Sequence, residues 1–329
     1  MLQPRDADYM KNDVCCPHVI CSARVICSAP GTLMLMGEHA VLYQRSALTA
    51  AIDQRVRVSI TLRDDDYIEI SSSTLGNFKT HLSDLQPCKP FEFVTTALTH
   101  SKMKKGLTCQ IESQCSHQMG LGTSAAVTVA SVAALAKIMG ETIDLYTVFK
   151  RALAVIRQVQ GQGSGADVAA STYGGVVKYT CKDIPSIEKL KNIPSLACVF
   201  SGYKMATKEV IALVKSRYEQ DKTTYEAIFT AIDDLVLKAA IAIEQEDLPL
   251  LGILFNRQQT LMQALEVSDS HLDFLIATLR AQKGILGAKI SGSGLGDCVI
   301  GLWDPKEKSP LPLENEIKVE ISPQGLLYE

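Results

Sequence analysis

A glycine-rich stretch placed directly before a long run of small residues constrains the fold of this chain more than any other feature. It reads MGLGTSAA over residues 119–126 and continues as SAAVTVASVAALAKIM over residues 124–139. The glycines allow a tight loop, and the small residues behind them predict a helix whose first N–H groups are free. Free N–H groups and the positive end of the helix dipole favour a phosphate group. The sequence therefore predicts a phosphate-binding loop and a helix that ends near Gly140.

Strand and helix patterns surround this loop. Residues 19–70 and Leu107–Ser113 are rich in β-branched residues and in alternation, which predicts strands, and Pro30-Gly31 predicts a turn within the first region. Later segments show mostly helical periodicity. Helices are expected at residues 91–104, 145–160, 207–219, 223–246, 248–265 and 270–283, and shorter strands at 176–180, 287–290, 299–303 and 317–321. A strand-rich first half and a helix-rich second half around a small sheet indicate an α+β fold.

The composition excludes several classes of protein. The chain has 329 residues, enough for one large domain or two medium ones, and its net charge is −3. This charge and the lack of long blocks of like charge argue against a nucleic-acid-binding protein. No run of 18 apolar residues predicts a membrane-spanning helix. We therefore expect neither a nucleic acid nor a membrane as a partner.

The N-terminal residues 1–22 have acidic residues near their start and lack the apolar core of a signal peptide, so a flexible leader is expected. Ten cysteines without a disulfide-like framework indicate a reducing, cytoplasmic location. Buried thiols explain the local group of cysteines better than a metal site does, because its spacing lacks paired CxxC motifs. This group consists of Cys15, Cys16, His18, Cys21 and Cys27.

Two further glycine-bearing segments accompany the loop. SAPGTLMLMGEHAVLY spans Ser28–Tyr43, and GAKISGSGLGDC spans Gly287–Cys298. A fourth segment, GSGADVAASTYGG, carries Asp167, which in isolation reads as a helix-capping aspartate. Taken together, in this order and spacing, these segments resemble the signature motifs of the GHMP kinases, named for galactokinase, homoserine kinase, mevalonate kinase and phosphomevalonate kinase.

The resemblance covers most of the chain and implies a fold. It implies an N-terminal strand-rich α+β domain, like domain 2 of ribosomal protein S5, and a C-terminal α+β ferredoxin-like domain, with the active site in the cleft between them. Residues 23–185 would form the N-terminal domain with the phosphate loop, and residues 186–329 the C-terminal domain. The expected cofactors are ATP and Mg²⁺.

The resemblance also implies roles for individual residues. Asp167, in an SGxD context, would take the proton of the acceptor hydroxyl as the catalytic base. The hydroxyl of Ser124 would ligate Mg²⁺, a hard cation that prefers oxygen, although Thr123 or Ser124 could also simply cap the helix. The expected ATP-binding residues are Gly120, Leu121, Gly122, Thr123, Ser124 and Ala125. The expected substrate-binding residues are Glu38, His39, Ser164, Gly165, Lys204, Thr207, Gly292 and Ser293.

Two positions depart from the pattern of the resembled family. Thr32 stands where mevalonate and phosphomevalonate kinases usually have a lysine next to the catalytic aspartate, and a threonine cannot supply that charge. Ile156 stands where mevalonate kinases usually have a Mg²⁺-binding glutamate. Either another cation compensates, since phosphoryl transfer depends mainly on positioning and charge, or the chain is a ligand sensor with little catalysis.

Different segments of the chain resemble kinases that act on different acceptors. Residues 28–58 and 254–276 look most like mevalonate kinases, whereas residues 163–175 and 291–298 look more like phosphomevalonate kinases. Because more of the chain favours the first, we expect phosphorylation of mevalonate to 5-phosphomevalonate in isoprenoid precursor synthesis, with phosphomevalonate as the alternative acceptor. The expected partners are thus a small hydroxy-acid substrate and a second copy of the chain in a homodimer.

Overall fold

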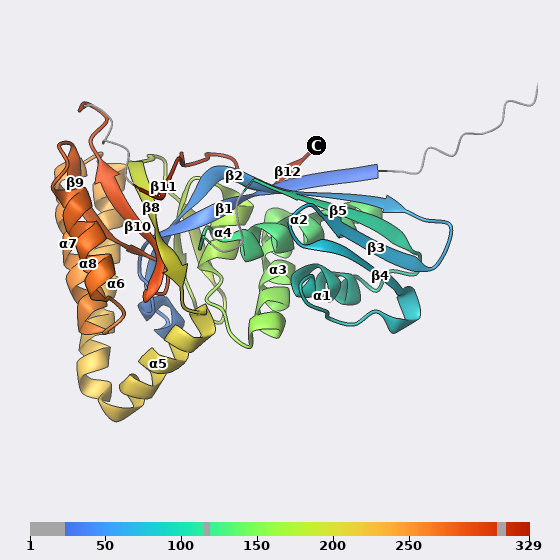
Figure 1. Cartoon of the computed structure of the whole chain (residues 1–329), viewed down its shortest axis with the longest axis horizontal. Helices are drawn as coiled ribbons and strands as arrows, with labels where there is room; N and C mark the ends of the chain where they lie inside the picture. Colours follow the sequence, from blue (N-terminus) through green and yellow to red (C-terminus); the bar gives the residue numbers. More distant parts are fainter. Residues whose placement is uncertain (1–23, 115–118, 308–313) are drawn as a thin grey trace, which may run out of the picture.

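The computed structural model describes residues 24–114, 119–307 and 314–329 and has two sheets, each covered by helices (Figure 1). The expected α+β fold is confirmed. The leader and the residues Cys15, Cys16, His18 and Cys21 lie outside the described residues. Cys27 is a buried free thiol, as expected. Within the described ranges, no helix is long and apolar enough to cross a membrane.

The first sheet is built on two long strands, β1 (Arg24–Met36) and β2 (Ser46–Leu62), which pair antiparallel. Its order is β12-β1-β2-β5-β3-β4, and β6 and β7 extend it from β2. The shorter strands are β3 (Tyr67–Ser72), β4 (Gly76–His81), β5 (Leu107–Ser113), β6 (Val176–Thr180), β7 (Ser186–Lys189) and β12 (Leu327–Tyr328).

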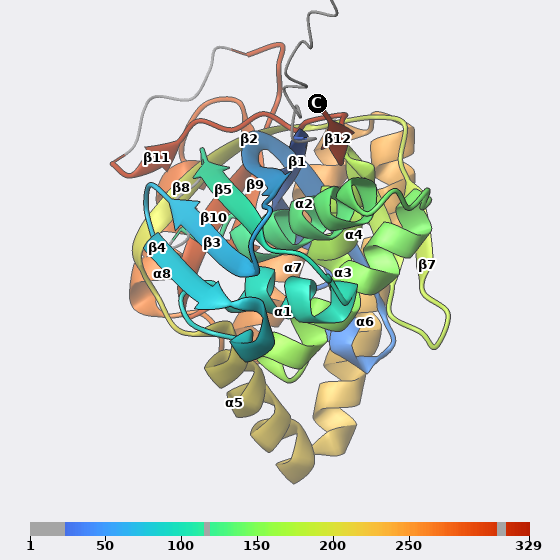
Figure 2. The ribbon, with the colours of Figure 1, turned by 90° about the vertical axis from the view of Figure 1, so that its right-hand side faces the viewer.

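Four helices pack against one face of this sheet (Figures 1 and 2). They are α1 (Glu92–Ser101), α2 (Thr123–Ile138), α3 (Leu145–Gln160) and α4 (Ala166–Tyr173). Helix α2 lies closest to β1 and β2 because its buried face is made of small residues such as Ala126, Ala130 and Ala133, all fully buried. The small side chains thus bring the start of α2, and the loop before it, up to the strands.

The second sheet has the order β11-β8-β10-β9. Its strands are β8 (Ser195–Lys204), β9 (Ile285–Ser291), β10 (Gly296–Trp303) and β11 (Glu316–Ile317). Helices α6 (Lys222–Glu244), α7 (Leu248–Ala264) and α8 (Ser270–Arg280) lie on one side of it, and α5 (Thr207–Gln220) projects below (Figure 1). Gly252 of α7 and Gly287 of β9 are in close backbone contact, which leaves no room for a side chain at either position.

The β1–β2 hairpin joins the two halves of the molecule. Leu33 and Leu48 pack in one apolar core with α6, α7 and the second sheet, whereas Cys27 and Val58 pack with α1–α4. The first sheet also takes in strands from beyond residue 185, because β7 pairs with β6 and β12 pairs with β1. The sheet therefore does not end at the expected domain boundary.

The sequence located most elements, and the differences have physical causes. The prediction of a turn at Pro30-Gly31 is wrong, because both residues lie inside β1. The register shifts between Pro30 and Thr32, and a strand tolerates a residue without an N–H at such a bulge. The strand expected at residues 317–321 is reduced to the two residues of β11. Strands β4 and β8 and helix α4 were not expected as regular elements.

Candidate active site

A cavity of about 980 Å³ lies where the two halves of the molecule meet. Its wall includes the start of α2, the loop before α4, the end of β8 and the loop between β9 and β10. Every expected site residue except Leu121 lines it. The three glycine-bearing segments and Asp167, far apart in the sequence, thus meet at one hollow.

The phosphate loop is fixed by its glycines and by β1. Gly120 and Gly122 have φ angles of 70° and 64°, values that glycine adopts at little cost. Gly122, not Thr123 or Ser124, is the N-cap of α2, so neither hydroxyl residue occupies the capping position. The N–H of Thr32 donates to the carbonyl of Leu121 at 2.9 Å, and the Leu121 side chain is fully buried. Leu121 therefore anchors the loop and does not face the cavity.

Asp167 lies in the first turn of α4, where the helix dipole favours a carboxylate. The hydroxyl of Thr32 donates to Oδ1 of Asp167 at 2.9 Å. Burial raises the pKa of Asp167, the Thr32 hydrogen bond and the charge of Lys204 lower it, and the charge of Asp297 raises it. A partly desolvated carboxylate with a raised pKa is a suitable proton acceptor.

The loop before Asp167 is held by the first sheet. The hydroxyl of Tyr179, on β6, donates to the carbonyl of Ser164 at 2.6 Å. A Cβ at Gly165, which has a φ of 96°, would lie 2.7 Å from this hydroxyl. The Ser164 hydroxyl accepts from the N–H of Ala166 at 3.2 Å. Ser164 and Gly165 therefore set the entry into α4 and place Asp167 at the cavity.

Glu38 has protein partners for both carboxylate oxygens. It forms an ion pair with Lys289 through Oε1, and Nε2 of Gln258 donates to Oε2 at 3.0 Å. The side chains of Glu38 and Lys289 are 1% and 0% exposed. Burial raises the pKa of Glu38 and lowers that of Lys289, while the opposite charge of each counteracts the shift. Both oxygens of the Glu38 carboxylate thus have protein partners at the wall of the cavity.

His39 connects the first motif to the third. Its Nε2 donates to the carbonyl of Ser293 at 2.8 Å, because a carbonyl can only accept. Burial lowers the pKa of His39, so the ring is neutral and Nδ1 is left as an acceptor. The Ser293 hydroxyl is buried and has no hydrogen-bond partner among the described residues, although Ser293 lines the cavity. These groups can bind a polar ligand.

Comparisons with known proteins agree with this geometry. The model of the GHMP kinases N terminal domain matches residues 91–175, and that of the GHMP kinases C terminal domain matches residues 239–310. A galactokinase galactose-binding signature matches residues 20–62. The mevalonate kinase of Thermococcus sibiricus is 31% identical over 93% of this chain and 98% of its own length. The chain belongs to the GHMP kinases.

Two further comparisons support this membership. The mevalonate kinase of Archaeoglobus fulgidus is 35% identical over 85% of this chain and 92% of its own length. The crystal structure of the Methanococcus jannaschii mevalonate kinase has the same fold, with a TM-score of 0.74, 23% identity and coverage of 87% of this chain and 92% of that one. This GHMP kinase is thus an enzyme that transfers phosphate from ATP to an alcohol.

A charged residue of the third motif was not among the expected site residues, and it lies beside the phosphate loop. Asp297 is 3% exposed, lines the cavity and forms an ion pair of 2.9 Å with Lys204. A Cβ added at Gly120 or at Gly292 would collide with its carboxylate. The one signal in the sequence is an aspartate at the end of a glycine-rich turn, where a charge has no structural reason to be.

The cavity suits a magnesium ion whose ligands are mainly waters and phosphate oxygens rather than protein side chains. Ile156 lines the cavity and brings no oxygen. Within the described ranges, no group of three His, Cys, Asp or Glu residues could hold a metal. Mg²⁺ keeps several waters and takes phosphate oxygens, so a single hydroxyl such as that of Ser124 is a compatible protein ligand.

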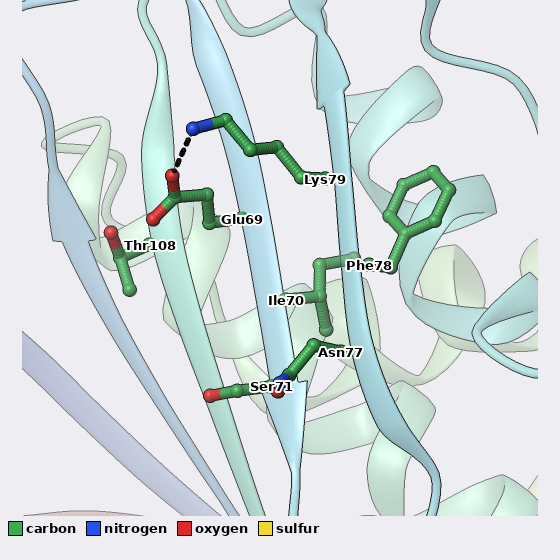
Figure 3. Close-up of a pocket in the computed structure, with 7 residues that line it drawn as sticks. All are labelled: Glu69, Ile70, Ser71, Asn77, Phe78, Lys79 and Thr108. Atoms are coloured by element: carbon green, nitrogen blue, oxygen red, sulfur yellow. Dashed lines mark ion pairs between the residues drawn. The ribbon is translucent and has the colours of Figure 1, made fainter.

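A smaller hollow of about 360 Å³ lies on strands β3 and β4 (Figure 3). Glu69 and Lys79 form an ion pair of 2.8 Å there, whereas the side chains of Ile70 and Phe78 pack in the core on the other face of these strands. Its polar side chains neutralise each other, and none of the motif residues reaches it. We therefore assign the chemistry of this kinase to the larger cavity.

Proposed function

We propose that this GHMP kinase transfers the γ-phosphoryl group of ATP to the primary hydroxyl of mevalonate and so makes 5-phosphomevalonate for isoprenoid precursor synthesis. One observation carries the proposal: Asp167, oriented by Thr32, faces the same cavity as the phosphate loop. The relatives from Thermococcus sibiricus and Archaeoglobus fulgidus, both mevalonate kinases, support the choice of acceptor.

The residues divide the reaction between them. The free N–H groups at the start of α2 bind the phosphates of ATP. The acceptor oxygen forms a bond to the γ-phosphorus, the bond from phosphorus to the β–γ bridging oxygen breaks, and ADP leaves. Asp167 takes the proton of the acceptor hydroxyl. Mg²⁺, which the Ser124 hydroxyl and the phosphates would hold, would neutralise part of the phosphate charge.

The acceptor end is formed by polar groups from both halves of the molecule. Lys204 and Thr207 lie where β8 leads into α5, and His39 and Ser293 line the same cavity from the first and third motifs. Mevalonate carries a carboxylate and two hydroxyls. A cation such as Lys208, which also lines the cavity, a neutral imidazole acceptor and a buried hydroxyl are suitable partners for these groups.

The protein's setting is also part of the proposal. We place it in the cytoplasm, which is supported by the free thiols of all six described cysteines. We retain Mg²⁺ as the metal and a homodimer as the assembly, and expect no nucleic-acid or membrane partner.

Phosphomevalonate is the second candidate acceptor. Three lysines, Lys89, Lys204 and Lys208, line the cavity, and their ammonium groups would suit an acceptor that already carries a phosphate. A ligand sensor with little catalysis is the third candidate, because the uncharged residues Thr32 and Ile156 stand where the resembled kinases usually have a lysine and a glutamate.

Measuring ADP release with mevalonate, 5-phosphomevalonate, galactose and homoserine separates these functions. We expect turnover with mevalonate that exceeds the turnover with each of the others. Turnover with phosphomevalonate alone would overturn the acceptor and keep the kinase. ATP binding by calorimetry without turnover on any acceptor would support the sensor. The D167N variant serves as the control for contaminating kinases.

A further inference from the structure

The start of β10 places a buried carboxylate beside the phosphate loop. Asp297 is 3% exposed and has a φ of 65°, a left-handed conformation that aspartate tolerates better than most residues. The register between β10 and β8 shifts between Gly296 and Cys298, so Asp297 is the residue at the bulge. Bulges redirect side chains and are frequent next to active sites. Here the bulge turns Asp297 toward the backbone of Gly120.

Lys204 is the partner that this carboxylate holds. Its Nζ lies 2.9 Å from Oδ1 of Asp297, and its side chain, 31% exposed, lines the cavity. Lys204 is the last residue of β8 and pairs in register with Gly296. Lys204 therefore stands at the end of a strand, and its ammonium group forms an ion pair with Asp297.

The charges around Asp167 show why a cation is needed at this place. Two carboxyl groups, those of Asp167 and Asp297, line the same cavity, and Thr32 contributes only a hydrogen bond. A triphosphate bound by the neighbouring loop would add further negative charge. Lys204 is the cation whose charge acts on Asp167. Two other lysines, Lys89 and Lys208, also lie on the cavity wall.

We propose that Lys204 is the catalytic cation of this kinase and that Asp297 is its positioning residue. Lys204 neutralises the charge that develops between the acceptor oxygen and the transferred phosphoryl group. Asp297 holds the Lys204 ammonium group at the point where the phosphate loop and the third motif meet. The inference rests on the proposed kinase function, and it explains how a site with Thr32 beside its aspartate obtains a positive charge.

The test compares kcat and KM of K204M, K204R and D297N with wild type on whichever acceptor the wild type phosphorylates. We expect K204M to lower kcat on the order of 10²-fold with little change in the KM for ATP, as for the loss of a preorganised charge in a transition state. K204R should recover at least part of this loss. The exposed Lys215 of α5, which does not line the cavity, supplies the matched control K215M, for which kcat should stay unchanged.

A lysine introduced at a second position tests the positive charge itself, independently of the local structure around residue 204. Because the Thr32 side chain contacts Asp167, T32K in the K204M background puts an ammonium group beside the same carboxylate. We expect T32K/K204M to exceed K204M in kcat at least tenfold. D297N should lower kcat less than K204M does, and K204M/D297N should be no slower than K204M, since the positioning residue acts only through the lysine.

Each other outcome overturns the proposal or a part of it. A K204M variant with wild-type kcat and a raised KM for the acceptor would make Lys204 a substrate anchor only. Additive losses in K204M/D297N, with an altered Mg²⁺ requirement in D297N, would make Asp297 a metal ligand. A folded K204M whose loss neither K204R nor T32K relieves would exclude the charge of Lys204 as the cause. A wild type inactive on all acceptors would overturn the proposed function first, and this inference with it.

Discussion

The hydroxyl of Thr32 donates a 2.9 Å hydrogen bond to the carboxylate of Asp167. The same Thr32 donates its backbone N–H to the carbonyl of Leu121 in the phosphate loop. One residue of β1 therefore ties Asp167, the proposed proton acceptor, to the loop proposed to bind the phosphates. A lysine at this position would supply charge, whereas threonine supplies a fixed distance between the two reacting groups.

The hydrogen bond from Thr32 predicts a change in pH dependence. The hydroxyl stabilises the charged form of Asp167 and lowers its pKa, against burial, which raises it. T32V removes the donor, so the pKa of Asp167 should rise and the acidic limb of kcat/KM should move to higher pH. T32S keeps a hydroxyl and serves as the control. If the acidic limb of kcat/KM lies at the same pH in T32V as in the wild type, Asp167 is not the group that titrates there.

Removal of the carboxylate tests the base directly. We expect D167N to lower kcat by a factor on the order of 10² or more, because an amide cannot accept the proton, with ATP affinity by calorimetry nearly unchanged. D144N is a matched control, since Asp144 caps α3 away from the cavity and asparagine caps equally well. If D167N and D144N have the same kcat, Asp167 has no role in proton transfer.

The elements that the sequence predicted best are those with strong local signals. The helix at residues 145–160 has an amphipathic pattern, a capping aspartate before it and Gly161 after it, and α3 has these bounds. Strand β8 was missed because SLACVFSGYK lacks clear alternation, and its place as a central strand depends on pairing with β10 and β11. Non-local pairing of this kind leaves no signal in the strand itself.

The same distinction holds for the site. Glycine-rich loops are visible in a sequence, because their backbone requires residues without side chains, and these loops do line the cavity. The pairs Lys204–Asp297 and Glu38–Lys289 join residues far apart in the chain, so their partners are defined only by the fold. This explains why Asp297 was overlooked.

Two glycines with similar backbone conformations allow the effect of backbone strain to be distinguished from the effect of a side-chain collision. Gly122 and Gly140 have φ angles of 64° and 75°. A Cβ at Gly122 would collide with the hydroxyl of Thr32, whereas a Cβ at Gly140 meets nothing within 4 Å. We expect both G122A and G140A to lose about 1–2 kcal/mol of unfolding free energy from the left-handed backbone. Only G122A should also lose ATP affinity, and equal ATP affinities in calorimetry would contradict the assignment of the loop.

The hydroxyl of Ser124 predicts a change in metal requirement. S124A should need on the order of tenfold more Mg²⁺ for half-maximal rate, which corresponds to about 1.4 kcal/mol, the contribution of one good polar contact. S131A is the control from the same helix, because Ser131 is fully buried and does not line the cavity. A Mg²⁺ titration of S124A that superimposes on that of S131A would remove Ser124 as a ligand.

The buried pair of Glu38 and Lys289 predicts strong coupling in stability. Either single change, E38Q or K289M, leaves one charge without its partner at a site at most 1% exposed. Breaking such a pair costs about 3–5 kcal/mol, whereas replacing both partners costs much less. Urea unfolding of E38Q, K289M and the double variant gives the coupling energy. We expect the double variant to be more stable than either single one, because it contains no unpaired charge; additive losses would instead show that each side chain stabilises the fold through separate contacts.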